Sequence, residues 1–250
     1  MSNNYSIIKK RNLYKGFFNL NEITLKHKKH NGKWTKILKR EIFSGSEVAA
    51  VLPYDPKNKK IILINQFRTG ILKQKINPMI NEIVAGIVDK HEKPIEAARR
   101  ECKEETGCAI KKVKKIVSFF PSPGASESYY HLYLGEVKSF KGFRITGQTQ
   151  EDEDILAKCY SVNEIKEMLN NNTIINGLSL IALQWFLLNY KKYNSLTKLK
   201  MTNDLFNTYD IYVKNKFLNV GVHFQYFKTP YMNLKRDYKC VQTCQRKDQK

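Results

Sequence analysis

The sequence lacks several features that mark particular classes of protein. Its most apolar stretch, residues 178–188, is too short to span a bilayer and is interrupted by Gln184. The opening residues, MSNNYSIIKK, lack the apolar core of a secretory signal peptide. The five cysteines are odd in number and follow no framework spacing, which indicates a reducing compartment. We therefore expect a cytoplasmic protein that has no membrane partner.

Acidic residues are scarce relative to basic ones. The chain holds 44 Lys or Arg and 23 Asp or Glu, a formal net charge of +21. Such a charge is typical of nucleic-acid or anionic-membrane binding, but it also arises from a lysine-rich solvated surface. We interpret the lysines as scattered along the chain and therefore favour the solvated surface, without nucleic acid as a partner. A positive field would still attract an anionic substrate.

Turn residues divide the chain into a succession of short elements. Residues 5–44 predict two or three antiparallel strands, too few to fold alone. β-rich runs at 47–54 and 59–67 predict a hairpin, and further strands are expected at 80–88, 115–120, 128–137 and 154–161. Helices are expected at 94–106, 162–170 and 177–190. This order of strands and helices indicates an α+β fold rather than a regular alternation.

Residues 86–108, GIVDKHEKPIEAARRECKEETGC, carry the clearest chemical signal. Pro94 suits the first turn of a helix and Gly107 is a natural helix stop. A helix between them places Glu101 and Glu105 on one face, because residues four apart lie one turn apart. Clustered carboxylates repel one another and are the natural ligands of hard divalent cations.

The surroundings of these carboxylates refine this interpretation. Ile95, Ala98 and Cys102 predict an apolar stripe beside them, so the acids would lie at the edge of a buried surface. Arg100 can pair with Glu104, four residues later, whereas Glu101 and Glu105 have no obvious partner. Taken alone, a glutamate-rich helix is more often an ordinary charged surface than a metal site. The spacing of the whole stretch distinguishes the two.

That spacing resembles the Nudix box, G-x5-E-x7-R-E-U-x-E-E-x-G-U, where U is aliphatic. Both aliphatic positions hold cysteine instead, at Cys102 and Cys108, and a buried cysteine behaves as a small apolar residue. The charged and glycine positions of the pattern are matched by Gly86, Glu92, Arg100, Glu101, Glu104, Glu105 and Gly107. By resemblance, Glu101 and Glu105 are metal ligands and the other five have a structural role.

The resemblance extends over about residues 8–192 and is closest to the ADP-ribose pyrophosphatase branch of the Nudix hydrolases. Pro123 lies sixteen residues after Gly107, a distance that marks this branch. The other similar pieces are LYKGFFNL (13–20), KREIF (39–43), NQFR (65–68), NEIVAG (81–86), SPGASE (122–127), EDEDI (151–155) and LSLIALQWF (178–186).

The resemblance implies a Nudix α/β/α sandwich with a small N-terminal β subdomain. Residues 1–45 would form that subdomain, which serves dimerisation and substrate contacts, and residues 46–195 would form the hydrolase domain. Residues 196–250 are a basic C-terminal extension to which we assign no role. Because the N-terminal piece is too small to bury its own apolar face, the resemblance implies a homodimer whose site is built from both chains.

The resemblance also implies roles for individual residues. Glu101, Glu105, Glu153 and the carbonyl of Ala85 would hold Mg²⁺, with Mn²⁺ as a substitute, and Glu151 would be the general base. Arg68 would hold phosphate and Glu82 would contact the substrate or orient its neighbours. The remaining residues implied to contact substrate are Phe17, Phe18, Arg40, Glu41, Ile87, Ser122, Pro123, Gly124 and Glu127.

The implied reaction is the hydrolysis of ADP-ribose to AMP and ribose 5-phosphate. One alternative is the same chemistry on another nucleoside diphosphate sugar, such as ADP-glucose or GDP-mannose. A second alternative, of a different class, is a nucleic-acid-binding protein with a basic surface, whose binding would not depend on Glu101 or Glu105.

Overall fold

A computed structural model describes residues 4–148 and 152–193, and they contain two sheets. The first has the strand order β1-β2-β3, all antiparallel, formed by β1 (Tyr5–Lys15), β2 (Asn19–His27) and β3 (Leu38–Ser44). This confirms the strands expected in residues 5–44. Nearly every residue of β1 is exposed, so this strand buries little of its own surface. The predicted extension 196–250 lies outside the described residues.

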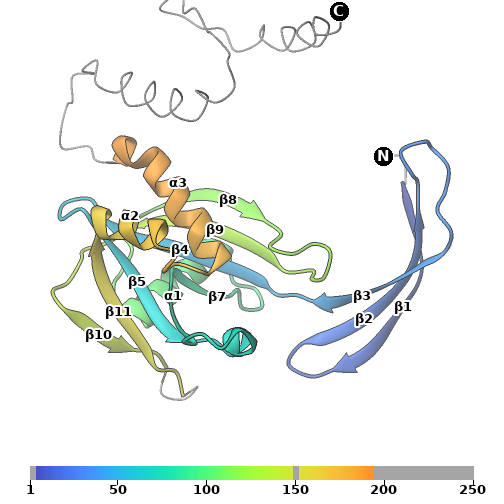
Figure 1. Cartoon of the computed structure of the whole chain (residues 1–250), viewed down its shortest axis with the longest axis horizontal. Helices are drawn as coiled ribbons and strands as arrows, with labels where there is room; N and C mark the ends of the chain where they lie inside the picture. The colour runs from blue at the N-terminus through green and yellow to red at the C-terminus, as the bar shows by residue number, and fades with distance from the viewer. Residues whose placement is uncertain (1–3, 149–151, 194–250) are drawn as a thin grey trace, which may run out of the picture. The chain divides into compact units, whose positions relative to one another are not determined.

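The second sheet is mixed, and helices pack against it (Figure 1). Its main path runs β10-β11-β5-β4-β9-β8, with β6 added to β5 and β7 added to β4. The strands are β4 (Glu47–Asp55), β5 (Lys60–Phe67), β6 (Met79–Glu82), β7 (Val84–Ile87), β8 (Lys112–Phe119), β9 (Tyr129–Glu136), β10 (Phe143–Thr146) and β11 (Ile155–Ser161).

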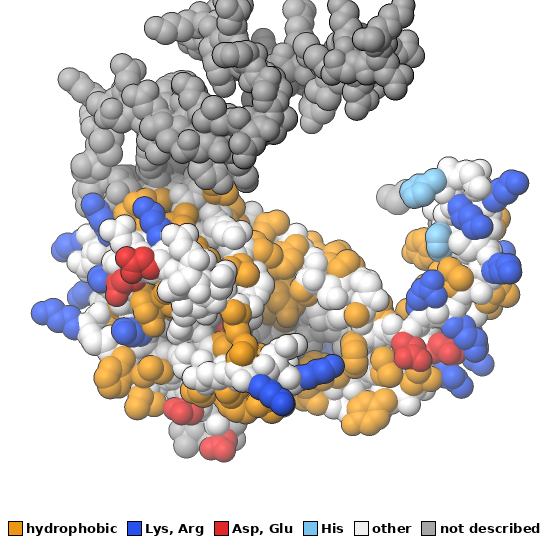
Figure 2. All heavy atoms as spheres, viewed as in Figure 1, with side chains coloured by type: hydrophobic (Ala, Val, Ile, Leu, Met, Phe, Trp, Pro, Cys, Tyr) orange, Lys and Arg blue, Asp and Glu red, His pale blue; other side chains and the backbone are white. Residues whose placement is uncertain are grey.

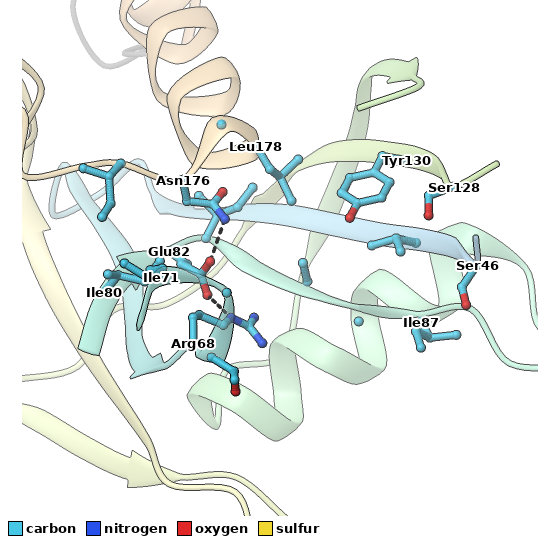
Figure 3. Close-up of a pocket in the computed structure, with 18 of the residues that line it drawn as sticks. Ser46, Arg68, Ile71, Ile80, Glu82, Ile87, Ser128, Tyr130, Asn176 and Leu178 are labelled. Atoms are coloured by element: carbon cyan, nitrogen blue, oxygen red, sulfur yellow. Dashed lines mark hydrogen bonds and ion pairs between the residues drawn. The ribbon is translucent and has the colours of Figure 1, made fainter. Parts of the chain in front are cut away.

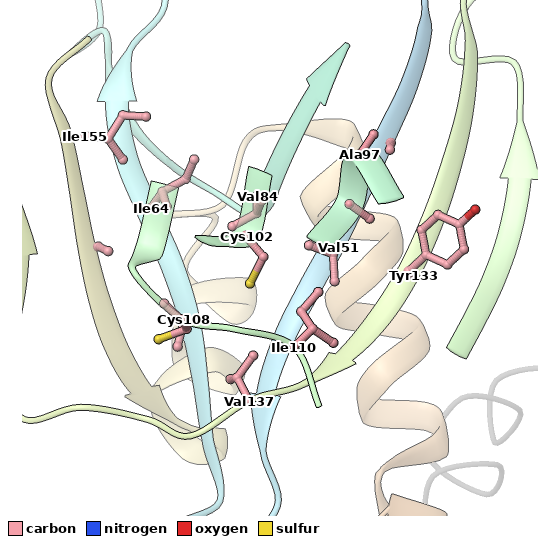
Figure 4. Packing of buried hydrophobic residues seen from close by; sticks show 14 residues of the cluster. Val51, Ile64, Val84, Ala97, Cys102, Cys108, Ile110, Tyr133, Val137 and Ile155 are labelled. Carbon is pink, nitrogen blue, oxygen red and sulfur yellow. The ribbon is translucent and has the colours of Figure 1, made fainter. Parts of the chain in front are cut away.

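Alternation along the central strands sends side chains to two separate cores. Ala49, Val51, Ile62 and Ile64 pack with helix α1 (Pro94–Thr106) on one face, as Figure 4 shows for part of this cluster. The neighbouring residues Ala50, Leu52, Ile61 and Leu63 pack with α2 (Val162–Asn170) and α3 (Gly177–Tyr193) on the other. The predicted α/β/α sandwich is therefore confirmed.

The helix boundaries follow from their end residues. Pro94 is the first residue of α1, and Gly107 ends it in the left-handed conformation at φ 69°. Ser161 caps α2 by accepting a hydrogen bond from the Glu164 backbone N–H. The Asn176 side chain accepts a hydrogen bond from the Ser179 N–H at 2.9 Å and so caps the start of α3.

Three expectations about the elements need correction. The run 80–88 is two strands, because the chain leaves β5 at Glu82 and joins β4 at Val84. Neither β10 nor a short 3-10 helix, Thr69–Gln74, was expected, and neither has a strong local pattern. The buried apolar stripe of α1 contains Ala97 together with Ala98 and Cys102, whereas Ile95 is 37% exposed.

Candidate active site

One arginine of α1, Arg100, forms hydrogen bonds that connect the helix to the loop before it. Arg100 donates hydrogen bonds to both carboxylate oxygens of Glu92, at 3.1 and 3.0 Å, and to the Ile87 carbonyl at 3.1 Å. It also contacts Glu104 at 3.2 Å, as its spacing predicts. The Glu92 carboxylate in turn accepts the Asp89 N–H at 3.2 Å. These contacts fix where α1 lies relative to β7, and with it the position of every carboxylate on the helix.

Glu105 is a buried carboxylate with an unsatisfied oxygen. It is only 5% exposed, and its Oε2 atom has no hydrogen-bond partner among the described residues. Burial raises the pKa of Glu105 to about 9, and repulsion from Glu101 and Glu153 adds to the rise. The Ala85 backbone N–H and the charge of Arg68 oppose this shift. An acid with such surroundings is unfavourable as an anion unless a cation joins it.

Glu101 lies between the helix and β7, against the backbone of Gly86. Burial raises its pKa, and Glu104 and Glu153 also raise it, while Arg100 opposes the shift. The expectation that Glu101 lacks a partner is wrong, because Arg100 Nη1 donates to its Oε1 at 2.7 Å. The carboxylates of Glu101, Glu105 and Glu153 are thus close enough to influence one another.

These residues fit a divalent cation in charge and in donor type. Three carboxylates share a site, two have raised pKa values, and one buried oxygen lacks a donor. Their oxygens do not yet converge: within residues 4–148 and 152–193, no three His, Cys, Asp or Glu side chains are placed to hold an ion. Glu101 would have to turn from Arg100 toward Glu105 to complete such a set.

A cavity of about 830 Å³ is lined by Ala85 and Gly86 of β7, and the Glu101 carboxylate lies against Gly86. Glu101, Glu105 and Glu153 are not among the residues that line it. The cavity is lined by apolar side chains around a small polar centre, an arrangement typical of small-molecule sites. Several residues predicted from the sequence come together here, although they derive from distant parts of the chain. Those that line the cavity are Phe17, Phe18, Arg68, Glu82, Ala85, Gly86 and Ile87.

The polar centre of the cavity is a chain of three side chains (Figure 3). Glu82, which is buried, accepts a hydrogen bond from Arg68 Nε at 2.7 Å and from Asn176 Nδ2 at 2.6 Å. Gln66 Nε2 donates to the same carboxylate at 3.2 Å. Both oxygens of Glu82 are therefore occupied by protein donors, which leaves Arg68 held in a fixed orientation at the cavity wall.

Asn176, which belongs to this centre, and Ser179, which is hydrogen-bonded to it, were not predicted as site residues. The Asn176 Oδ1 atom accepts from the N–H and the hydroxyl of Ser179, at 2.9 and 3.1 Å. The Ser179 hydroxyl accepts the Ile83 N–H at 3.0 Å, which links α3 to the end of β6. An asparagine immediately before a helix is a recognised capping signal, so its helix contact could have been found. Its contact with Glu82, 94 residues away, could not.

The remaining predicted substrate residues do not line this cavity. The loop at 122–127 instead binds the N-terminal sheet: Phe43 N–H donates to the Ala125 carbonyl at 2.9 Å, and Glu127 N–H to the Phe43 carbonyl at 3.0 Å. Lys10 pairs with Glu127 at 3.5 Å. Ser122, Pro123 and Gly124 belong to this loop, and Arg40 and Glu41 lie in β3. Glu151 lies outside the described residues.

Arg40 and Glu41 are exposed and are neighbours in one strand, so their side chains project from opposite faces of the sheet. In the register, Arg40 pairs with Ile23 and Glu41 with Glu22. Arg40 makes a hydrogen bond only to the adjacent Lys39 carbonyl, at 2.9 Å, among the described residues. Neither side chain therefore reaches the cavity of its own chain.

Comparison with known proteins agrees with this architecture. Residues 45–176, more than half of the chain, match the NUDIX domain model. The chain is 34% identical over 189 residues to the ADP-ribose pyrophosphatase of Escherichia coli (strain K12), covering 76% of this chain and 90% of that protein. It is 36% identical to the Haemophilus influenzae ADP-ribose pyrophosphatase, covering 74% and 86%. The chain belongs to the Nudix family and is a hydrolase of pyrophosphate bonds.

Two further similarities bear on fold and specificity. The chain is 31% identical to the GDP-mannose pyrophosphatase of Salmonella arizonae, over 74% of this chain and 96% of that protein. A crystal structure described as an ADP compounds hydrolase superposes with a TM-score of 0.58 and 16% identity, covering 77% of this chain and 97% of that one. That similarity supports the fold alone. None of the described helices is both long and apolar enough to cross a membrane.

Proposed function

We propose that this protein hydrolyses the pyrophosphate bond of ADP-ribose, giving AMP and ribose 5-phosphate, with Mg²⁺ as its cofactor. The observation that carries this proposal is the buried carboxylate of Glu105, whose Oε2 atom has no partner among the described residues, together with Glu101 and Glu153 and a cavity of about 830 Å³ lined by Ala85 and Gly86. The ADP-ribose pyrophosphatases of two bacteria support the choice of substrate. Nudix hydrolases generally use divalent metal ions, and the donor set here is oxygen only, which suits Mg²⁺.

We assign the metal site to the carboxylates of Glu101, Glu105 and Glu153 and to the carbonyl of Ala85, with Mn²⁺ as a substitute. When bound, the cation neutralises charge on the pyrophosphate oxygens and orients the attacking water. Glu151 is proposed as the general base that accepts the proton of that water. Gly86 leaves the space that the Glu101 carboxylate occupies, and Arg100 sets the position of α1.

The cavity residues bind and orient the substrate. Arg68, fixed by Glu82, offers its remaining N–H groups to a phosphate. Phe17 and Phe18 pack edge to face at 4.8 Å and line the cavity, where they can stack on an adenine. Ile87 bounds the same space. We also assign Ser122, Pro123, Gly124 and Glu127 to the ribose side of the substrate, and Arg40 and Glu41 to substrate contacts.

Several features support a homodimer in which the N-terminal sheet of one chain completes the site of the other. Phe17 is 84% exposed although it lines the cavity, and β1 has large exposed apolar side chains such as Tyr5 and Ile7. A second copy that covers them would bury this surface. Neither Arg40 nor Glu41 lines the cavity of its own chain, and a partner's cavity would give them a substrate to contact.

A cytoplasmic location fits the same picture. Cys102, Cys108 and Cys159 are free thiols, and burial raises the pKa of Cys102 to about 12, which keeps it protonated and unreactive. Free, protonated thiols are the normal state in a reducing compartment.

A substrate panel tests the choice of ADP-ribose. With Mg²⁺ present, we expect kcat/KM for ADP-ribose to exceed that for ADP-glucose and GDP-mannose by at least roughly tenfold, an energy difference of about 1.4 kcal/mol. A higher kcat/KM for GDP-mannose would overturn the substrate and favour the second candidate, which the similarity to a GDP-mannose pyrophosphatase supports.

A further inference from the structure

The N-terminal part of the chain is rich in positive charge for its length. Residues 1–44 contain eleven Lys or Arg and two Asp or Glu, a net charge of +9. Residues 45–193, more than three times as long, contain 22 Lys or Arg and 17 Asp or Glu, a net charge of +5. The expectation that the lysines are scattered is therefore wrong for this region. Of residues 4–44, which the structure describes, only Phe17 and Phe18 line the cavity, so hydrolysis of a small substrate leaves most of this charge unexplained.

Much of this charge belongs to one hairpin, which we call the Trp34 hairpin, residues 26–39. It contains Lys26, Lys28, Lys29, Lys33, Lys36 and Lys39, together with His27 and His30, and it has no acidic residue. The hairpin is ordered by its backbone: Lys28 and Trp34 form an antiparallel bridge, and Lys29 N–H donates to the Lys33 carbonyl at 2.8 Å. Gly32 makes the tight turn at φ 79°. Figure 2 shows basic side chains along this part of the surface.

Trp34 is placed among these cations. It is 41% exposed, and its ring centroid lies 5.0 Å from Lys26 Nζ and 5.9 Å from Lys28 Nζ. Lys29 and Lys33 are exposed at the turn and form no ion pair with a described residue. The two acids of the sheet that flank the hairpin in sequence, Glu22 and Glu41, both lie outside it. Glu22 is already paired, with Arg11 at 3.4 Å and with Lys39 at 3.6 Å.

Like charges held this close repel one another, so an anion that spans several of them would stabilise the hairpin. An exposed aromatic ring within a basic surface is the combination that binds single-stranded nucleic acid, because bases stack on the ring while lysines contact phosphates. A membrane surface would favour several apolar side chains that insert together. Apart from Trp34, the hairpin exposes one large apolar side chain, Ile37, and the Trp34 ring stands among ammonium groups. We propose that the Trp34 hairpin is a binding site for single-stranded nucleic acid, separate from the hydrolase cavity.

Binding of a labelled single-stranded RNA of about 20 nucleotides to the full-length protein, followed by fluorescence anisotropy, tests this proposal. The test variant replaces Lys26, Lys28 and Lys33 with Gln. The matched control replaces Lys111, Lys112 and Lys115, three exposed lysines at the start of β8, and removes the same charge. Circular dichroism and light scattering on both variants exclude unfolding and a changed oligomeric state as causes.

We expect the hairpin variant to bind at least tenfold more weakly, and its slope of log K against log salt to shrink by about 2, because each lost phosphate contact removes about 0.7. We expect the control variant to change the affinity less than threefold. Trp34→Ala should weaken binding without changing the salt slope, and Trp34→Phe should restore most of it. Equal loss in both triple variants, no loss in the hairpin variant, or loss of binding to anionic vesicles but not to RNA would each overturn the proposal.

Discussion

The carboxylate of Glu101 lies directly against the backbone of Gly86, where any side chain would occupy the same space. A Cβ atom at residue 86 would overlap Oε1, Oε2 and Cδ of Glu101. All three are at the far end of a flexible side chain, so a larger residue here moves the carboxylate rather than the strand. The glycine in β7 and the glutamate in α1 are therefore two parts of one arrangement.

Gly86→Ala should preserve the fold but impair hydrolysis. We expect kcat/KM for ADP-ribose to fall by roughly 100-fold, because a ligand displaced by about 1 Å loses the productive geometry. Thermal unfolding of the variant should remain close to that of the wild type. The double variant Gly86→Ala/Glu101→Gln should be no less active than Glu101→Gln alone, because both act on the same carboxylate. If the losses of kcat/KM in the two single variants multiply in the double variant, Gly86 acts through a group other than the Glu101 carboxylate.

Glu105→Gln should stabilise the metal-free protein while it abolishes activity. The pKa of Glu105 is about 9 in the folded protein, above the ordinary value of about 4.3 for an unfolded glutamate. At a pH between these two pKa values, Glu105 takes up a proton when the protein folds. The metal-free wild-type protein therefore loses stability as the pH rises from about 4.3 to about 9. At pH 7 we expect the variant to be more stable by at least about 1 kcal/mol, roughly 2 to 4 °C in Tm.

The pH dependence provides the control for this prediction. Below pH 4 the wild-type Glu105 is protonated in both states, so the difference between the two proteins should disappear. Differential scanning fluorimetry in chelator, at a series of pH values, measures this directly. A variant that is less stable than the wild type at pH 7 would contradict the assignment of Glu105 as an uncompensated buried acid.

Asn176→Ala should weaken substrate binding through Glu82 and Arg68. Removal of the amide leaves Glu82 Oε1 without its donor at 2.6 Å, and the carboxylate that orients Arg68 becomes free to move. We expect kcat/KM to fall about 10- to 100-fold, mainly through KM, as for the loss of one hydrogen bond to a charged group. Asn171→Ala, which removes an exposed turn contact to Thr173, is the matched control and should leave both constants unchanged. A purely structural role would lower Tm in Asn176→Ala and leave KM unaltered.

Asp55→Asn should destabilise the fold at neutral pH but much less in acid. Burial opposes ionisation of Asp55, but hydrogen bonds from Ser139 and Asn58 outweigh it and hold its pKa well below the ordinary value. Ser139 donates both its N–H and its hydroxyl, each at 2.7 Å. The resulting stability is present above the unfolded pKa of about 3.9 and is lost as the pH falls through the depressed folded pKa. We expect a loss of about 1 to 3 kcal/mol at pH 7 in urea unfolding, narrowing below pH 4. A loss of stability that does not depend on pH would contradict the view that the ionised Asp55 carboxylate provides this stability.

The sequence predicts the parts of this molecule that depend on local rules. The start of α1 at Pro94 and its end at Gly107 follow from the backbone preferences of those two residues, and the structure places both ends there. Except for β10, the strands of the central sheet lie within β-rich runs of the sequence, and the alternation of their side chains yields the two cores. The spacing of the box gave the family, which comparison with known proteins confirms.

The features that could not be predicted depend on contacts between distant residues. The run 80–88 reads as one strand, and only pairing with β5 and β4 divides it. The pairing of Glu101 with the adjacent Arg100 depends on rotamers that the loop contacts of Arg100 select. The role of Asn176 requires that α3 begin beside β6, and the sequence contains no signal for that placement.

Release of AMP from ADP-ribose tests the central claim most directly. The wild-type protein and Glu105→Gln are incubated with ADP-ribose, with Mg²⁺ or with excess chelator, and products are separated by chromatography. The account predicts AMP and ribose 5-phosphate only from the wild-type protein and only with the metal. Hydrolysis that persists in chelator, or at an equal rate in Glu105→Gln, would contradict the assignment of this carboxylate site as the catalytic centre.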